Sequence, residues 1–246
     1  MMKVSYALAF TLVVSAGLAR AQTPPPAPTP PPLWSGKAEL AYAGTSGNTD
    51  TSSLGTGFEV AYRPAPWTVE GKFAYLRAST DGVTTAEALL ASARGSRDMT
   101  PRIDLFVQAA YGRNTFAGID GRYSGEAGAG YKVLTGPDVT LRGEMGFGYT
   151  HENRTTGDSL GFATGRAGVK FVWKFSKFAD FTDELSWTES FANTSDWLLR
   201  NAASVSATLT SLLSLKVSYA VVHDNVPVPG FKKTDTITAA ALVAKF

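Results

Sequence analysis

The chain has 246 residues and a net charge of +2, so we expect one sizeable domain and no nucleic-acid partner. Mean hydropathy is −0.04, and the chain after its first residues has no run of about eighteen apolar residues, which excludes a bundle of transmembrane helices. Cysteine is absent, which excludes a disulfide framework, a thiolate nucleophile and a cysteine metal site.

Residues 1–21 have the pattern of a secretory signal peptide, with basic Lys3, an apolar stretch and the cleavage sequence Ala19-Arg20-Ala21. An N-terminal membrane anchor is the alternative, but the apolar stretch is short for a span. Residues 22–33 read QTPPPAPTPPPL and predict an extended, Pro-rich periplasmic linker. We interpret it as a stiff tether, with peptidoglycan contact or partner docking as the alternative. The folded domain is then 34–246.

Alternation of apolar and polar residues continues from Trp34 to Phe246 and predicts an all-β fold. The clearest segment is 139–149, where the residues from Val139 to Tyr149 alternate between an apolar and a polar face. The segment 85–97 is ambiguous because its Ala, Leu and Glu also favour a helix. We interpret it as a strand because both neighbouring strands need a partner. The predicted strands are 34–44, 53–63, 67–77, 85–97, 102–113, 122–134, 139–149, 160–174, 180–191, 196–210, 213–223 and 234–246.

About twelve strands, an even number, fit an antiparallel up-and-down barrel with both termini on the periplasmic side. Connections after even-numbered strands are short, as in 64–66 and 135–138, and several after odd-numbered strands are longer, as in 151–159 and 224–233. Short periplasmic turns and longer outer loops are typical of outer-membrane barrels.

Alternation alone also fits a soluble β-barrel or sandwich, and three observations favour the membrane. Aromatic residues recur eight positions apart, as in Trp34 and Tyr42, and on a tilted strand this spacing is roughly 20 Å, close to the separation of two aromatic girdles. Twelve strands also enclose too much volume for a dry core. Phe246 ends an alternating strand, which resembles the signal read by the barrel-assembly machinery. The predicted girdle is Trp34, Tyr42, Tyr62, Trp67, Tyr75, Tyr111, Tyr123, Tyr131, Tyr149, Trp173, Trp187, Trp197 and Tyr219.

The opposite, polar face would then line a wet lumen. Its basic and acidic residues alternate, which favours a lumen crossed by ion pairs over a pore with rings of one sign. A small basic excess leaves room for a weak anion preference. The predicted lumen-lining residues are Lys37, Glu39, Glu59, Glu70, Lys72, Glu126, Lys132, Arg142, Glu144, Arg166, Lys170, Glu184, Arg200 and Lys216.

Catalysis has little support, and we expect no cofactor and no metal. The only histidines, His151 and His223, continue outward faces near the outer rim, where a lipid-modifying enzyme would need a serine beside one of them. Ser159 is the one serine that could approach His151 across a loop. Acidic residues such as Asp158 and Asp196 lie in separate loops without a calcium motif.

The segment from Trp34 to Leu40, followed by Ser46-Gly47-Asn48-Thr49 and a second alternating strand, resembles the YdiY-like, salt-induced outer-membrane protein family (domain of unknown function 481). The resemblance implies an outer-membrane barrel and supplies no catalytic residue. We therefore expect a non-enzymatic envelope protein, either a narrow small-solute pore or a stress-related structural protein. The expected partners are outer-membrane lipids, the assembly machinery through the C-terminal strand, and small solutes in the lumen. The alternatives are a lipid-modifying enzyme at the outer rim and a soluble periplasmic β protein.

Overall fold

A computed structural model describes residues 32–45 and 51–246 of the chain. The predicted signal peptide, most of the Pro-rich linker and the Ser46–Thr49 motif lie outside the described residues. Within the described residues, no helix has the length and apolar character needed to cross a membrane.

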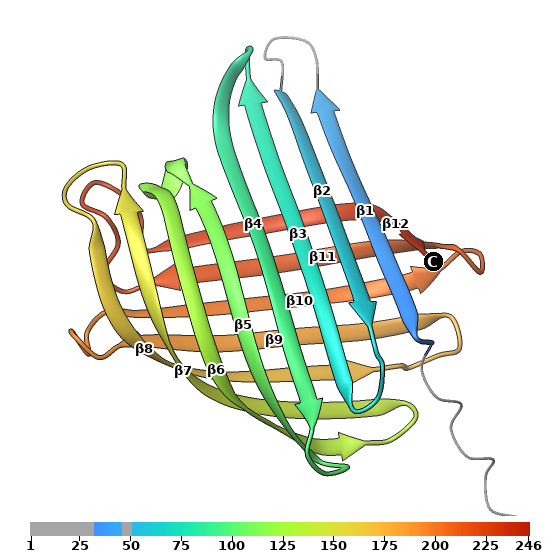
Figure 1. Ribbon diagram of the computed structural model, residues 1–246. Coiled ribbons are helices and arrows are strands. Elements are labelled where there is room, and N and C mark those ends of the chain that lie inside the picture. The colour runs from blue at the N-terminus through green and yellow to red at the C-terminus, as the bar shows by residue number, and fades with distance from the viewer. Residues whose placement is uncertain (1–31, 46–50) are drawn as a thin grey trace, which may run out of the picture. The chain divides into compact units, whose positions relative to one another are not determined.

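Twelve antiparallel strands close into one barrel, in which each strand pairs with its chain neighbours and β1 pairs with β12. Figure 1 shows β1 to β4 crossing in front of β9 to β12. The strands are β1 (Trp34–Thr45), β2 (Thr51–Tyr62), β3 (Trp67–Thr80), β4 (Val83–Asp98), β5 (Ile103–Asn114), β6 (Ile119–Thr135), β7 (Val139–Arg154), β8 (Leu160–Trp173), β9 (Ala179–Ser190), β10 (Trp197–Thr208), β11 (Leu213–Asp224) and β12 (Thr234–Lys245). The predicted all-β, twelve-strand barrel is confirmed.

The ambiguous segment is a strand, β4, which pairs with β3 and β5 along most of its length. Pairing on both sides outweighs the weak helix preference of its Ala and Leu residues. Asp81 and Gly82 make the turn before it, and both have positive φ angles of 50° and 78°. This is the geometry of a two-residue hairpin turn whose twist matches the strands.

The two ends of the barrel differ. At the even-strand end the connections are short, as in 63–66 and 136–138. At the odd-strand end, the connection 115–118 forms a 3-10 helix, η1 (Thr115–Ala117), and residues 225–233 form a longer loop between β11 and β12. We call these the turn end and the loop end.

The seam between β1 and β12 is short, with paired residues from Lys37 opposite Lys245 to Leu40 opposite Leu242. Next to it, Gly36 and Phe246 exchange two backbone hydrogen bonds of 2.7 and 3.1 Å. The Phe246 ring lies against Gly36, where a Cβ atom would overlap it, and its centroid is 6.2 Å from that of Phe58. Gly36 therefore leaves open the space that this ring occupies.

Candidate functional site

The interior of the barrel contains a cavity of about 650 Å³ with many charged side chains. Among the described residues, nine basic and nine acidic side chains line it, so its net charge is zero. Ten of the predicted lumen residues are in this lining: Glu70, Lys72, Glu126, Lys132, Arg142, Glu144, Arg166, Lys170, Glu184 and Arg200.

The other four predicted lumen residues pair with one another near the seam. The ammonium of Lys37 lies 3.7 Å from Glu59 on the neighbouring strand. The ammonium of Lys216 on β11 donates to Glu39 on β1 at 2.9 Å. Because β12 lies between β11 and β1 in the barrel, this second pair bridges the seam.

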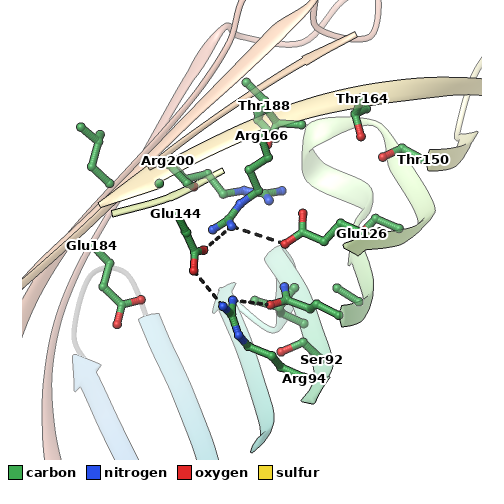
Figure 2. A pocket seen from close by; sticks show the side chains of 18 of the residues that line it. Ser92, Arg94, Glu126, Glu144, Thr150, Thr164, Arg166, Glu184, Thr188 and Arg200 are labelled. Atoms are coloured by element: carbon green, nitrogen blue, oxygen red, sulfur yellow. Dashed lines mark hydrogen bonds and ion pairs between the residues drawn. The ribbon is translucent and has the colours of Figure 1, made fainter. Parts of the chain in front are cut away.

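The centre of the lumen is crossed by an ion-pair network, which we call the central cluster: Arg94, Asp104, Glu126, Arg142, Glu144 and Arg166. Glu144 on β7 contacts three guanidinium groups, those of Arg94 at 2.9 Å, Arg142 and Arg166. Figure 2 shows Arg94 and Arg166 converging on Glu144 from opposite sides. Arg142 also binds Asp104 at 2.7 Å, and Arg166 reaches Glu126 at 3.3 Å. The cluster has three positive and three negative groups and draws on five adjacent strands, β4 to β8.

Aromatic and glycine residues hold the central cluster in place. The guanidinium of Arg94 lies 3.8 Å from the ring centroid of Phe106, a cation–π geometry. Phe106 is buried, and its ring fits because Gly128 and Gly146 have no side chain to occupy that space. Gly130 leaves the corresponding space for the guanidinium of Arg142. These contacts position two of the arginines independently of Glu144.

A second network, the loop-end cluster, consists of Arg122, Glu152, Arg154 and Asp224. Glu152 is 1% exposed and lies between Arg122 and Arg154, to which it binds with a hydrogen bond of 2.7 Å each. Arg122 on β6 also lies 3.8 Å from Asp224 on β11. This pair joins strands that are five places apart in the barrel order.

The long loop 225–233 closes over the same end. Val228 is 2% exposed, and a Cβ atom on Gly118 would lie only 2.7 Å from it. Gly118 belongs to the β5–β6 connection, on the opposite side of the barrel order from β11 and β12. The loop therefore extends to the far rim and docks there.

Asp196, just before β10, lies at the loop end beside further acidic groups. Burial raises the pKa of its carboxyl above the ordinary value, and the nearby carboxylates of Asp224 and Glu152 raise it further. Arg154 and Arg122 oppose this effect in part. The loop end thus contains a carboxyl group that protonates more readily than a free aspartic acid.

Several lumen residues do not belong to the predicted set: Arg94, Asp104, Arg122, Glu152 and Arg154. Arg94 was missed because the segment 85–97 was ambiguous, although its parity with Ser92 and Ser96 places it inside. Glu152 and Arg154 continue the polar face of Arg142 and Glu144, but the predicted strand ended at Tyr149, whereas β7 continues to Arg154. Continuing the alternation of inward and outward residues beyond Tyr149 predicts that Glu152 and Arg154 face the lumen.

The outer face is apolar and rich in aromatic residues. Large side chains such as Met145 and Phe147 are 70% and 73% exposed there. The predicted girdle residues share this face by strand parity, and several stack in pairs. The ring centroids of Trp34 and Tyr62 are 4.3 Å apart near the turn end, and those of Trp187 and Trp197 are 5.6 Å apart near the loop end.

The histidines lie on this outer side. His151 helps to line a shallow apolar depression with Tyr123 and Tyr149. Ser159 donates to Asn153 at 2.9 Å, and the Nδ1 atom of His223 lies 2.8 Å from the hydroxyl of Thr234. Within residues 32–45 and 51–246, no group of three or more His, Asp or Glu side chains is arranged to hold a metal ion.

Comparison with known proteins places this geometry among outer-membrane barrels. A family model described as "Protein of unknown function, DUF481" matches residues 38–246. The "Uncharacterized protein YdiY" of Escherichia coli (strain K12) is 25% identical over 196 residues, which is 79% of this chain and 75% of that protein. The COG4313 outer membrane channel from Pseudomonas putida F1 superposes with a TM-score of 0.52 at 12% identity, covering 92% of this chain and all of that one. The NanC porin superposes with a TM-score of 0.50 at 9% identity, covering 86% and 97%. At these identities the structures bear on the fold alone.

Proposed function

The chain belongs to the family "Protein of unknown function, DUF481", and we propose that it is a non-enzymatic barrel of the bacterial outer membrane whose lumen is a narrow passage for small solutes. The observation that carries this proposal is the neutral central cluster, which spans five strands inside a barrel with a cavity of about 650 Å³. Ion pairs of this kind close a passage at rest without filling it with an apolar core.

The outer face supports the membrane location. Side chains such as Leu40 and Phe147 are more than half exposed. They belong to the apolar residues that face outward along the strands, between the more polar rims of the barrel. An apolar surface of this extent is unfavourable in water and matches the acyl chains of a bilayer. The charged residues lie on the inward face, which is the reverse of a soluble barrel with a dry core.

The loop end supports a passage that is closed at rest. Loop 225–233 lies over the mouth and docks on Gly118, and the loop-end cluster lies beneath it. A solute that enters from this side has to displace the loop and then pass the central cluster. Both barriers consist of contacts that can break and re-form, so the passage can open without unfolding the barrel.

Conductance in planar bilayers tests the passage. We expect a small or rarely opening current from the purified protein and a larger one from Glu144→Gln, since this change removes the carboxylate on which three arginines converge. Asp158→Asn, in the exposed β7–β8 connection, is the matched control and should conduct like the unchanged protein. Silent bilayers for both the unchanged protein and Glu144→Gln would contradict the passage and favour a structural role.

Orientation is tested with single cysteines, because the chain contains none of its own. We propose that both termini and the turn end face the periplasm. Asp158→Cys at the loop end should then react with a membrane-impermeant maleimide on intact cells. Ser211→Cys, in the turn between β10 and β11, should react only after the outer membrane is permeabilised. The reverse labelling pattern would show that the barrel has the opposite orientation. Recovery of both labelled variants in the soluble periplasmic fraction would contradict the membrane location.

A further inference from the structure

Arg200, on the inward face of β10, differs from the other arginines of the lumen. Arg94, Arg122, Arg142, Arg154 and Arg166 each have a carboxylate within 4.0 Å. In the described part of the chain, Arg200 has no carboxylate within that distance and no side-chain hydrogen bond, although it lines the cavity. Figure 2 shows its side chain extending into the cavity next to that of Arg166.

The charges around Arg200 do not supply a substitute partner. The positive charges of Arg122 and Arg166 act on its guanidinium more strongly than the negative charge of Asp224 does. Arg122 is already bound to Glu152, and Arg166 is bound to Glu126 and Glu144. The acidic groups nearby are therefore used by other arginines, and Arg200 lies between the central cluster and the loop-end cluster as an excess positive charge.

Hydroxyl groups complete the surroundings of Arg200. Ser186 on β9 is its direct neighbour in the strand register, and Thr188 follows two positions along on the same inward face. Both line the cavity. Hydroxyls can donate to an anion that a guanidinium holds, and they add no competing negative charge.

A guanidinium does not lose its proton in a protein, so Arg200 stays charged at every physiological pH. The Arg200 side chain is exposed within the lumen, so its charge is accessible to water and to any solute that enters the cavity. The planar fork of an arginine fits two oxygens of a carboxylate or a phosphate. We propose that Arg200 is the centre of a binding site for a small oxyanion, with Ser186 and Thr188 as hydroxyl donors and with Arg122 and Arg166 adding long-range attraction.

The proposal deepens the proposed function, because the oxyanion would be the solute, or part of the solute, that occupies the passage between its two ion-pair barriers. The defining group is a carboxylate or a phosphoryl group on a molecule that fits a cavity of about 650 Å³. The geometry does not require the rest of the solute to be charged.

Calorimetric titration of the purified barrel in a neutral detergent tests the site, with inorganic phosphate and with succinate as separate probes at constant ionic strength. We expect at least one probe to bind the unchanged protein and to bind Arg200→Gln at least tenfold more weakly. Arg102→Gln removes the same charge from an exposed turn outside the cavity and should bind like the unchanged protein. Arg200→Lys keeps the charge without the planar fork and should fall between the two.

Equal binding by Arg200→Gln and the unchanged protein, or binding of neither probe to the unchanged protein, would overturn the proposal. The folded fraction of each variant is read from the gel mobility of unheated samples, so loss of folding is not mistaken for loss of binding. Bilayer recordings separate this outcome from the passage itself. Binding without current would leave the anion site standing and remove the passage, and current without binding would do the reverse.

Discussion

Replacing Glu144 with glutamine should destabilise the barrel, because three guanidinium groups converge on this carboxylate. The Glu144 side chain is 10% exposed and the Arg94 side chain 14% exposed, so their pair is buried. Removing one partner from a buried ion pair costs about 3–5 kcal/mol, because the other charge is left uncompensated.

The arginines around Glu144 do not all lose their partners in this variant. Arg142 keeps Asp104 at 2.7 Å, and Arg166 keeps Glu126 at 3.3 Å. Arg94 is left with a long hydrogen bond of 3.4 Å to Gln108. Only one arginine is therefore orphaned, and we expect a loss near the lower end of the range, about 3 kcal/mol.

The free energy of unfolding, measured by urea titration in lipid vesicles, checks this value. Glu184→Gln is the matched control, because the pair between Lys170 and Glu184 is 48% and 44% exposed and should contribute less than about 1 kcal/mol. The double variant with Arg94→Gln should be more stable than Glu144→Gln alone, since it removes the orphaned charge. Equal losses in Glu144→Gln and Glu184→Gln, or a double variant that loses the sum of both single changes, would refute the reasoning.

Three further predictions concern the ends of the barrel and the seam. Because the folded state holds the proton of Asp196 more tightly than the unfolded state does, stability falls as the pH rises from the ordinary aspartate pKa of 3.8 through the raised pKa. Asp196→Asn should therefore raise the urea midpoint at pH 7 and leave it unchanged at about pH 3. An equal shift of the midpoint at both pH values would contradict this. Val228→Asp places a charge in the buried contact with Gly118 and should release loop 225–233, seen as a higher conductance in bilayers; an unchanged current would show that the loop does not close the mouth. Gly36→Ala forces the ring of Phe246 away from the seam and should cost about 1–3 kcal/mol in urea unfolding, so an unchanged midpoint would show that the ring contact is dispensable.

The strands could be predicted from the sequence because alternation is a local property. All twelve predicted segments are strands, including 85–97, since lumen and lipid impose opposite preferences on successive residues. The strand ends were less predictable. β7 runs five residues beyond the predicted end at Tyr149, because Thr, Asn and Arg occupy that stretch and resemble a loop.

The ion-pair partners could not be predicted, because they depend on the three-dimensional register. Arg94 and Glu144 are 50 residues apart, and Glu39 and Lys216 are 177 residues apart. Parity determines that such residues face inward, but not which of them meet. Alternating signs along a strand predict a lumen crossed by ion pairs but do not identify the partners: Arg142 pairs with Glu144 on its own strand, whereas Glu39 pairs with Lys216 on β11 and not with Lys37.

The same partner assignments explain why a lumen of zero net charge can still select for charge. Pairing is uneven. The central cluster is neutral by itself, whereas the charged groups that act most strongly on Arg200 and on Asp196 have the same sign as the residue itself. Asp196 lies at the loop end, and Arg200 lies deeper in the lumen. An anion that enters from the loop end would first meet repulsion and then a site that holds it, so the mouth limits its entry and Arg200 sets its residence. Selectivity in this barrel would therefore arise from the positions of Arg200 and Asp196, since rings of one sign are absent from the described lumen.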